Sequence, residues 1–364
     1  MKNKINIWDG LFIYTIISIV IGFLVGAIML VIAGIDPMVA YGKLIEGIFS
    51  KPKFITYSIT YASPYIFTGL SVAFAFKTGV FNIGAEGQFV MGALAAVLVG
   101  IFVDLPPVLH AIVAIIAAAI VGGIWGAIVG LLKITRGINE VLSYIMFNWI
   151  AYYISNFVVT HKGVKEASTE STKMIKDSAR LTMPASIVNM TDCPVINWGI
   201  IIAIAAAIIL WFVIKKTTLG YELRAVGLSK TASEYAGISS SKIFMISMAL
   251  SGILSSVGGA VEILGMAGRV SQFAAQESFG FDGITVALMA SSNPIGCIFS
   301  GLFYGAMKYG GNKLTIVNAP KEIINIIMGT IIFFIAIAVL FRRVMISINE
   351  KRNKKVKVNL KGVK

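Results

Sequence analysis

Long apolar runs separated by short polar stretches dominate this chain of 364 residues. Most runs are close to the roughly 20 residues that an α-helix needs to cross the hydrocarbon core of a bilayer, and one is clearly shorter. The pattern predicts an all-α integral membrane protein with about ten membrane segments. The predicted segments are 11–33, 54–76, 79–102, 108–132, 141–159, 198–214, 243–264, 281–290, 295–309 and 323–341.

Three stretches between these segments are less apolar. Residues 34–53 mix charged and apolar side chains and are expected to form a loop. Residues 161–197 belong to the longest polar stretch and are expected to form a large loop on one side of the membrane. Residues 265–280 contain Gly and Gln and are only moderately apolar, so they are either a surface loop or a re-entrant segment.

A conspicuously polar stretch between two apolar blocks runs from Thr217 to Ser241. Thr231 and Glu234 have the spacing of a capping box, in which Thr231 would cap the start of a helix. Gly237 then suits a left-handed helix end. The stretch predicts one short helix of about two turns, exposed to water between two spans. An ordinary connecting loop is the alternative.

The charge of the chain is strongly positive, with 31 Lys and Arg against 17 Asp and Glu. Many of the basic residues lie in a tail at 342–364 that follows an apolar span. Such a tail predicts a cytoplasmic flank near anionic membrane lipid and argues against nucleic-acid binding. With residues 1–10 also inside, alternation across 11–341 places both termini and the 215–241 loop in the cytoplasm, and 161–197 outside the cytoplasm.

No catalytic or metal-binding pattern accompanies this membrane signature. The two cysteines, Cys193 and Cys297, are far apart, and the two histidines, His110 and His161, cannot build a metal centre alone. The phosphate-binding G-x-x-x-x-G-K-[ST] pattern is absent, as are the common hydrolase motifs. We therefore expect a chain without metal or cofactor that is not itself an enzyme.

Polar residues inside apolar segments are the candidates for function. Asn82, Glu86 and Gln88 lie at the mouth of one segment, with Gly84 and Gly87 permitting a broken helix. Such groups usually face a cavity or a partner helix, and broken helices often carry the substrate-facing groups of transporters. The alternative is a cytoplasmic turn in which Asn82 and Glu86 only cap helix ends.

Two further clusters admit a structural and a functional interpretation. Glu140, Tyr144 and Asn148 share one helix face by their four-residue spacing. They could line a passage, but we favour hydrogen bonding between helices. Asp282 heads a short apolar helix and is expected to cap it, whereas Asn293 stands before a proline that breaks the segment.

Four short stretches carry a family resemblance. They are Phe81–Gln88, Arg136–Val141, Thr218–Gly227 with Ala236–Ile238, and Gly280–Ile284. Together they resemble permease subunits of ABC importers, in the branch that serves ribose-type sugars, branched-chain amino acids and nucleosides. The chain is most similar to the larger of the two permeases of nucleoside importers.

The resemblance implies a type II importer permease in the bacterial cell membrane, with a cytoplasmic coupling helix near 229–238. It implies three partners: a separate ABC ATPase, a second and non-identical permease, and an extracytoplasmic substrate-binding lipoprotein. Nucleosides are the implied cargo. The residues expected to couple the chain to the ATPase are Glu222, Arg224, Ser229, Thr231, Glu234 and Gly237. The candidates for the translocation path are Asn82, Glu86, Gln88, Asn148 and Asn293.

Other functions remain open from the sequence. Ribose-type sugars or another small polar solute could be the cargo of the same kind of importer. An ion-coupled secondary transporter would need an ion-binding carboxylate, for which Glu86 is the best candidate. A membrane scaffold would not need a capped polar helix between its spans.

Overall fold

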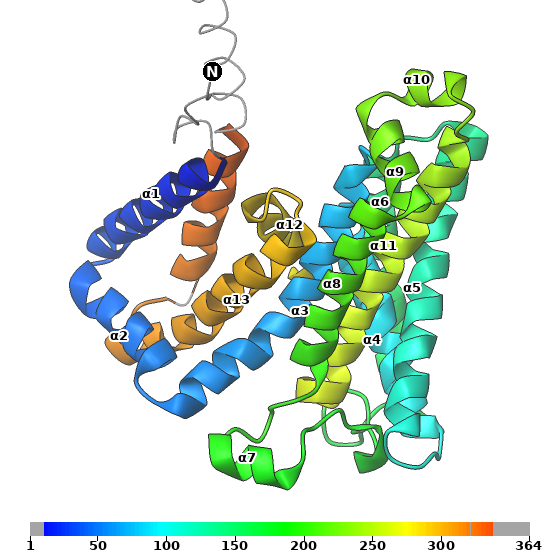
Figure 1. Cartoon of the computed structure of the whole chain (residues 1–364). Helices are drawn as coiled ribbons and strands as arrows, with labels where there is room; N and C mark the ends of the chain where they lie inside the picture. Colours follow the sequence, from blue (N-terminus) through cyan, green and yellow to red (C-terminus); the bar gives the residue numbers. More distant parts are fainter. Residues whose placement is uncertain (1–10, 321, 338–364) are drawn as a thin grey trace, which may run out of the picture.

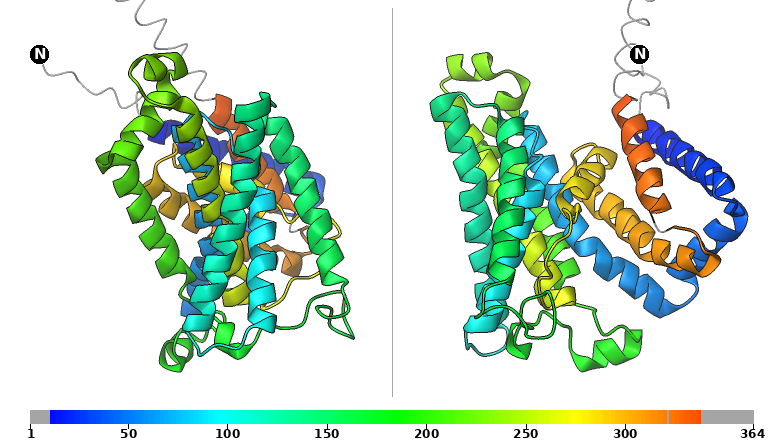
Figure 2. Two further views of the ribbon diagram at one scale, coloured as in Figure 1. Left: turned by 90° about the vertical axis from the view of Figure 1, so that its right-hand side faces the viewer. Right: turned by 180° about the vertical axis from the view of Figure 1, so that it is seen from behind.

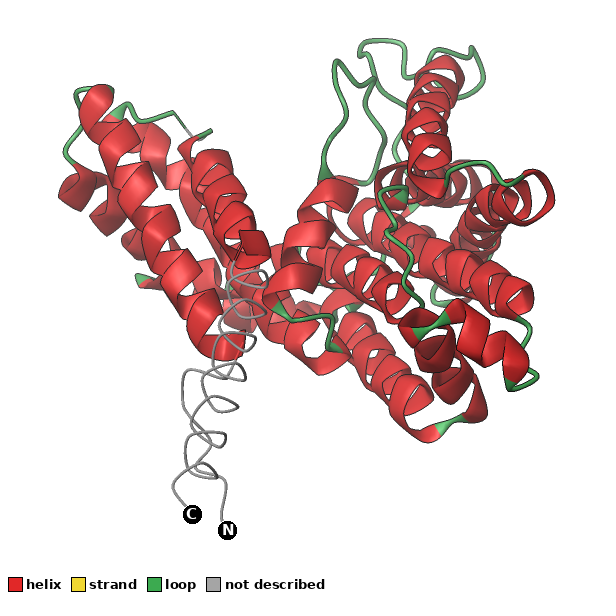
Figure 3. Cartoon of the chain, turned by 90° about the horizontal axis from the view of Figure 1, so that it is seen from above, coloured by secondary structure: helices red, strands yellow, loops and turns green. Residues whose placement is uncertain are grey.

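Helices account for all the regular secondary structure in residues 11–320 and 322–337, the part of the chain that the computed structural model describes (Figure 3). The predicted all-α class is confirmed there, whereas the predicted N-terminal segment 1–10 and basic tail 342–364 lie outside the described residues. The helices are α1 (Leu11–Ile32), α2 (Pro37–Phe49), α3 (Pro52–Lys77), α4 (Ala85–Phe102), α5 (Leu109–Arg136), α6 (Glu140–Val159), α7 (Ala185–Thr191), α8 (Gly199–Lys216), α9 (Thr218–Leu228), α10 (Lys230–Tyr235), α11 (Ser240–Glu262), α12 (Phe279–Met289), α13 (Pro294–Gly311) and a last, unlabelled helix Ile323–Ile337. Shorter turns of 3-10 helix lie at Asp177–Ala179 and Asn312–Val317, and a π-helical turn at Ile263–Ala267.

Each of the ten predicted apolar segments coincides with a helix over most of its length, although residues 79–84 form a turn before α4 and the last segment is described only to residue 337. Seven helices among the described residues are long and apolar enough to cross a membrane: α1, α3, α4, α5, α6, α8 and the continuous helix made by α11 and its π-helical turn. The other three segments correspond to α12, α13 and Ile323–Ile337. The chain therefore has the helices of a multi-pass membrane protein, and a count of ten crossings stays a prediction.

The expected loop at 34–53 is wrong, because most of this stretch forms α2. Asp36 caps the helix by accepting a hydrogen bond from the Met38 amide at 2.8 Å. Pro37 occupies the first turn, where a missing amide hydrogen costs nothing. Leu44 and Ile48 are buried, and α2 packs against α13. Lys43 and Glu46, two of the charged residues that suggested a loop, form an exposed ion pair on this helix.

The helices form two groups that are joined by α3 (Figure 1). One group is an upright bundle of α4, α5, α6, α8 and α11, and the other contains α1, α2, α13 and Ile323–Ile337. α3 packs against α11 on one side and against α12 and α13 on the other. α9 and α10 stand at one end of the bundle, and α7 with the long polar segment lies at the opposite end (Figure 2).

Glycines allow α4, α5 and α11 to approach one another closely. A β-carbon added to Gly252 of α11 would lie 2.2 Å from the carbonyl oxygen of Gly122 on α5. Serines on α11 add hydrogen bonds across the interface, with Ser256 donating to the Gln88 carbonyl at 2.6 Å. Small residues and interhelical hydrogen bonds are what hold helices together where lipid removes the hydrophobic drive.

α12 is a short helix that begins inside the protein. Its first residue, Phe279, stacks on Tyr65 near the middle of α3, with ring centroids 5.2 Å apart. Further along α12, Gly283 packs directly on Thr68. Residues 268–278, which precede α12, lead inward from the end of the bundle that carries α7. At that end, the Phe273 carbonyl accepts hydrogen bonds from Tyr152 and Asn156 of α6. Residues 265–280 therefore run from one end of the bundle to its interior, and the choice between a surface loop and a re-entrant segment stays a prediction.

The long polar segment 160–198 is folded against the ends of the helices. Leu181 donates to the carbonyl of Leu264 at 2.8 Å, and the Thr172 amide to that of Val270 at 2.9 Å. Asp192 forms an exposed ion pair with Lys53 at 2.9 Å, and the hydrogen bond from this ammonium holds the pKa of the Asp192 carboxyl below its usual range. The segment therefore has a defined conformation although it contains little regular structure.

Candidate functional site

Glu86 connects the start of α4 to the start of α12. Its two carboxylate oxygens accept hydrogen bonds from the amides of Ser278 and Gly280, at 2.8 and 2.7 Å. The Glu86 residue is 1% exposed. These amides belong to the first turn of α12, whose unpaired N–H groups and helix dipole favour a negative charge. A Gly-x-acid-Gly pattern occurs at the start of both helices, at Gly84–Gly87 and Gly280–Gly283.

The other polar residues around Glu86 bond within the protein. Asn82 donates to the Gln88 side chain at 3.0 Å and to the Ser71 hydroxyl at 3.1 Å. Asn148 of α6 accepts from the Gly87 amide at 2.8 Å and donates to a backbone carbonyl of the preceding turn at 3.1 Å. The side chains that make these contacts are almost entirely buried. The residues therefore have a structural role at the turn before α4. A place on the translocation path stays a prediction for all of them.

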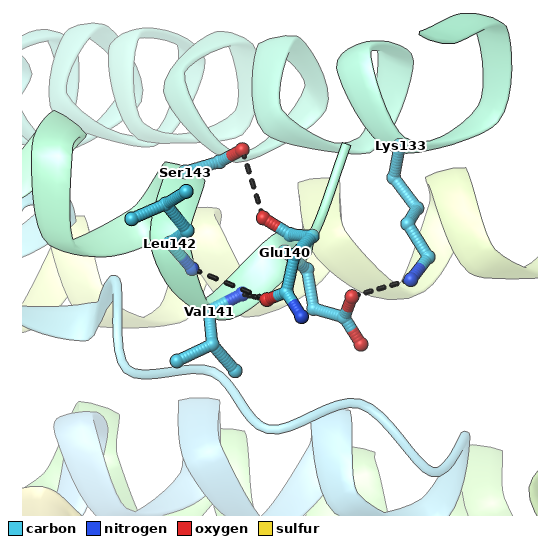
Figure 4. Close-up of polar contacts among 6 residues, drawn as sticks. Lys133, Glu140, Val141, Leu142 and Ser143 are labelled. Atoms are coloured by element: carbon cyan, nitrogen blue, oxygen red, sulfur yellow. Dashed lines mark hydrogen bonds and ion pairs between the residues drawn. The ribbon is translucent and has the colours of Figure 1, made fainter. Parts of the chain in front are cut away.

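Glu140 bonds across the turn between α5 and α6, as Figure 4 shows. Its carboxylate pairs with Lys133 of α5 at 2.5 Å. The neighbouring Asn139 caps α6 by accepting from the amides of Val141 and Leu142, at 2.9 and 3.3 Å. Glu140 and Asn148 therefore make the helix-to-helix contacts that we favoured from the sequence. Tyr144 does not, because its buried hydroxyl has no hydrogen-bond partner among the described residues.

The polar stretch 217–241 forms two helices where one was predicted. Thr217 caps α9 by accepting from the Gly220 amide at 3.2 Å. The cap of α10 is Ser229, whose hydroxyl accepts from the Ala232 amide at 3.3 Å. The prediction that Thr231 caps this helix is therefore wrong, because the helix begins at Lys230 and Thr231 lies within its first turn.

Glu234 and Gly237 end α10. The Glu234 carboxylate accepts from the Ser240 hydroxyl and so bonds forward to the start of α11, not back to a cap. Gly237 has a φ of +83°, as predicted for a left-handed helix end. The Ile238 amide closes the end by donating to the Ser233 carbonyl at 2.9 Å. α10 is thereby held as a short rigid unit of six residues.

The two helices α9 and α10, which together form the α9–α10 unit, expose large apolar side chains. Leu228 is 89% exposed and Tyr235 is 91% exposed. Neither residue was predicted from the sequence, although apolar residues in an otherwise polar segment are a detectable signal. Their positions beside the α10 caps give the end of the bundle a small apolar surface.

α9 is seated directly on the end of α3. A β-carbon on Gly227 would lie 2.2 Å from the Lys77 carbonyl oxygen, so the two backbones are in contact. Glu222 is half-buried on α9. The Arg224 side chain donates to the Gly220 carbonyl at 3.1 Å.

A cavity of about 420 Å³ brings one coupling candidate and one path candidate together. Arg224 of α9 and Asn293, which caps α13 by accepting from the Ile295 amide at 3.1 Å, both line it. Lys77 and Lys215 contribute further positive charge. The cavity adjoins the end of the bundle where α9 meets α3, α12 and α13.

Asp282 does not cap α12, contrary to the prediction. Ser278 occupies the cap position, and the Asp282 carboxylate instead pairs with Lys308 of α13 at 3.0 Å. Lys308 was not predicted as a functional residue from the sequence. A lysine inside a predicted apolar segment was the available signal, because charged residues within membrane helices are rare and face cavities or partners.

Comparison with known protein families shows which family the chain belongs to. A family model described as the branched-chain amino acid transport system / permease component matches residues 54–336. The chain belongs to this permease family. The matched region contains the Glu86 cluster, the α9–α10 unit and the Asp282–Lys308 pair.

Curated relatives cover nearly the whole permease. The guanosine ABC transporter permease protein NupP of Bacillus subtilis is 39% identical over 92% of this chain and 96% of its own length. The nucleoside ABC transporter permease protein NupB of Lactococcus lactis is 36% identical over 88% and 90%. The glucose ABC transporter permease protein TsgB13 of Haloferax volcanii is 28% identical over 92% and 89%. No solved structure matches the chain.

The Bacillus and Lactococcus transporters each include a second similar permease. NupQ of Bacillus subtilis is 27% identical over 68% of this chain and 78% of its own length. NupC of Lactococcus lactis is 25% identical over 78% and 90%. Each of the two transporters thus has a permease more similar to this chain and another less similar to it.

Proposed function

We propose that the chain is the membrane permease subunit of an ATP-driven ABC importer and forms a path for nucleosides. The observation that carries this proposal is the alignment with NupP, a guanosine permease by name, over almost the full length of both chains. NupB, a nucleoside permease by name, gives the same class of cargo. The more distant glucose permease supports a sugar as the second candidate.

The proposed assembly contains a separate ATPase and a second permease. NupP and NupQ, and likewise NupB and NupC, are pairs of different permeases that carry the same transporter name. A non-identical second permease is therefore the natural partner of this chain. An extracytoplasmic binding lipoprotein would deliver the cargo to the end of the bundle that carries α7 and the long polar segment.

The α9–α10 unit is the proposed contact with the ATPase. We place this end of the bundle in the cytoplasm, with both termini on the same side. Movement of α10 would reach α9, and through Gly227 the end of α3 and the turn before α4. Glu86 links α4 to the start of α12, inside the protein. Discontinuous helices at mid-depth are where alternating-access transporters hold their substrates.

Replacing the exposed apolar residues of the α9–α10 unit tests this docking surface. The double variant Leu228→Asp, Tyr235→Asp is expected to weaken binding of the ATPase about tenfold or more, because buried anchor residues dominate interface energies. The measurement is ATPase binding to the purified permease pair in nanodiscs. The control is Met190→Asp on α7, which is 79% exposed at the opposite end. Equal ATPase binding by the double variant and the control would refute the assignment.

Purification of the permease from native membranes tests the function as a whole. The ATPase, the second permease and the binding lipoprotein are expected to copurify, and proteoliposomes containing them should take up guanosine only with ATP. Uptake of glucose or ribose in place of nucleosides would favour the sugar alternative. Uptake by this chain alone down an ion gradient would replace the importer with a secondary transporter.

A further inference from the structure

A second cavity, of about 450 Å³, lies among α12, α13, the helix Ile323–Ile337 and the residues just before α12. Its volume is within the roughly 300–1,000 Å³ of small-molecule pockets. Ser278 and Phe281 line it, so it adjoins the start of α12, which is near the middle of α3. None of the path candidates predicted from the sequence is among its lining residues.

A charged pair lies on the wall of this cavity. The Lys308 ammonium is 3.0 Å from the Asp282 carboxylate and donates to the Asn325 side-chain oxygen at 2.9 Å. The two charged side chains are only 24% and 16% exposed. Charges within a membrane bundle are costly and mark substrate or ion pathways. The pair presents a strong donor and a strong acceptor side by side.

Thr285 offers an unused polar group at the same place. The residue lines the cavity and is 1% exposed, and its hydroxyl has no hydrogen-bond partner among the described residues. Buried hydroxyls almost always have a partner, so a missing one needs an explanation. The hydroxyl oxygen has almost no accessible surface, so a polar group of a bound solute would supply the partner once the Thr285 side chain turns toward the cavity.

The rest of the lining selects the class of solute. Glu277 and Asp282 outnumber Lys308, the one basic residue of the wall, so phosphorylated solutes are disfavoured by charge repulsion. Phe281 and Tyr304 contribute aromatic rings, and flat rings pack well against such side chains. The lining therefore fits an uncharged solute that combines a flat ring with hydrogen-bonding groups.

We propose that this cavity is a nucleoside-binding subsite of the permease. Lys308 donates to a carbonyl oxygen on the edge of the base, Asp282 accepts from the adjacent ring N–H, Phe281 contacts the ring face, and Thr285 bonds to a ribose hydroxyl. Guanosine and inosine carry this carbonyl beside an N–H, whereas adenosine carries an amino group beside a bare ring nitrogen. The subsite rests on the proposed function and adds a base preference to it.

Uptake by the full importer in proteoliposomes tests the subsite. Guanosine and adenosine uptake are compared for wild type, Lys308→Met and Asp282→Asn, with the same binding lipoprotein throughout. We expect each variant to lose about tenfold in uptake efficiency for guanosine, the size of one hydrogen bond to a charged group, and much less for adenosine. The matched controls are Lys43→Met and Glu46→Gln, which remove an exposed ion pair on α2. They should leave the ratio of guanosine uptake to adenosine uptake unchanged.

The outcomes separate the subsite from the function. If wild type takes up no nucleoside, the proposed function itself is wrong. If wild type takes up nucleosides but the variants lose both nucleosides equally, or neither, only the subsite is wrong. Should the charge variants fail to assemble, Thr285→Val decides, because it keeps the shape of the side chain. It should lower guanosine uptake about fivefold, and unchanged uptake would overturn the proposal.

Discussion

Replacing Gly252 with leucine is expected to leave little folded permease in the membrane. A β-carbon at this position would lie 2.2 Å from the Gly122 carbonyl oxygen and 3.4 Å from the α-carbon of Gly126. Both neighbours are backbone atoms of α5, so no side chain can rotate away. Overpacking of a well-packed core costs about 1–3 kcal/mol and sometimes more, and here α5 and α11 must separate.

The control for this variant is Gly42→Leu on α2, where an added β-carbon meets nothing within 4 Å. Leucine is also a better helix former than glycine, so this variant should fold as well as wild type. The measurement is the yield of monodisperse protein in mild detergent and its melting temperature. A Gly252→Leu protein that melts with wild type would contradict the close contact of α5 and α11.

Removal of the Glu86 carboxylate should give the second large effect. Glu86→Ala leaves the Ser278 and Gly280 amides without the acceptor described above, at a cost of about 1–3 kcal/mol for each buried donor. Glu86→Gln keeps one acceptor oxygen but turns an NH2 group toward the other amide. The stability that this variant loses should therefore lie between those of wild type and Glu86→Ala. We expect the order wild type, Gln, Ala in melting temperature, and a parallel loss of ATP-driven uptake.

Glu46→Ala is the matched control for this series, because Glu46 is an exposed glutamate that forms a surface ion pair with Lys43. It should melt as wild type does. Equal melting temperatures for Glu86→Ala and Glu86→Gln would show that hydrogen bonding to the start of α12 is not what the carboxylate contributes. Full uptake by Glu86→Ala at wild-type stability would also remove Glu86 from the candidates for the path.

The sequence predicted the helices well because a long apolar run has few alternatives to a membrane helix. α2 was missed because its charged and apolar residues share one helix on different faces, which resembles a mixed loop when scanned as composition. The cap of α10 was misplaced by two positions because Ser229 and Thr231 are both good cap residues. The residue at which the helical backbone begins, Lys230, shows that Ser229 is the cap.

The polar residues could not be assigned from the sequence because their partners are distant in the chain. Glu86 bonds to Gly280, and Asp282 was expected to act within its own helix but pairs with Lys308 on the next one. A capping residue, a helix-to-helix bond and a path residue look the same until the partner is known. The cavity at Thr285 was missed for the same reason, since its walls come from three separate segments of the chain.

The seat of α9 on α3 has a mechanical consequence. Side chains between two helices normally act as soft spacers, because their rotamers can change and absorb a small displacement. At Gly227 no such spacer exists, and the backbone of α9 touches the Lys77 carbonyl directly. A displacement of α9 toward α3 therefore has no slack at this contact, and the turn that leads into α4 must move with it.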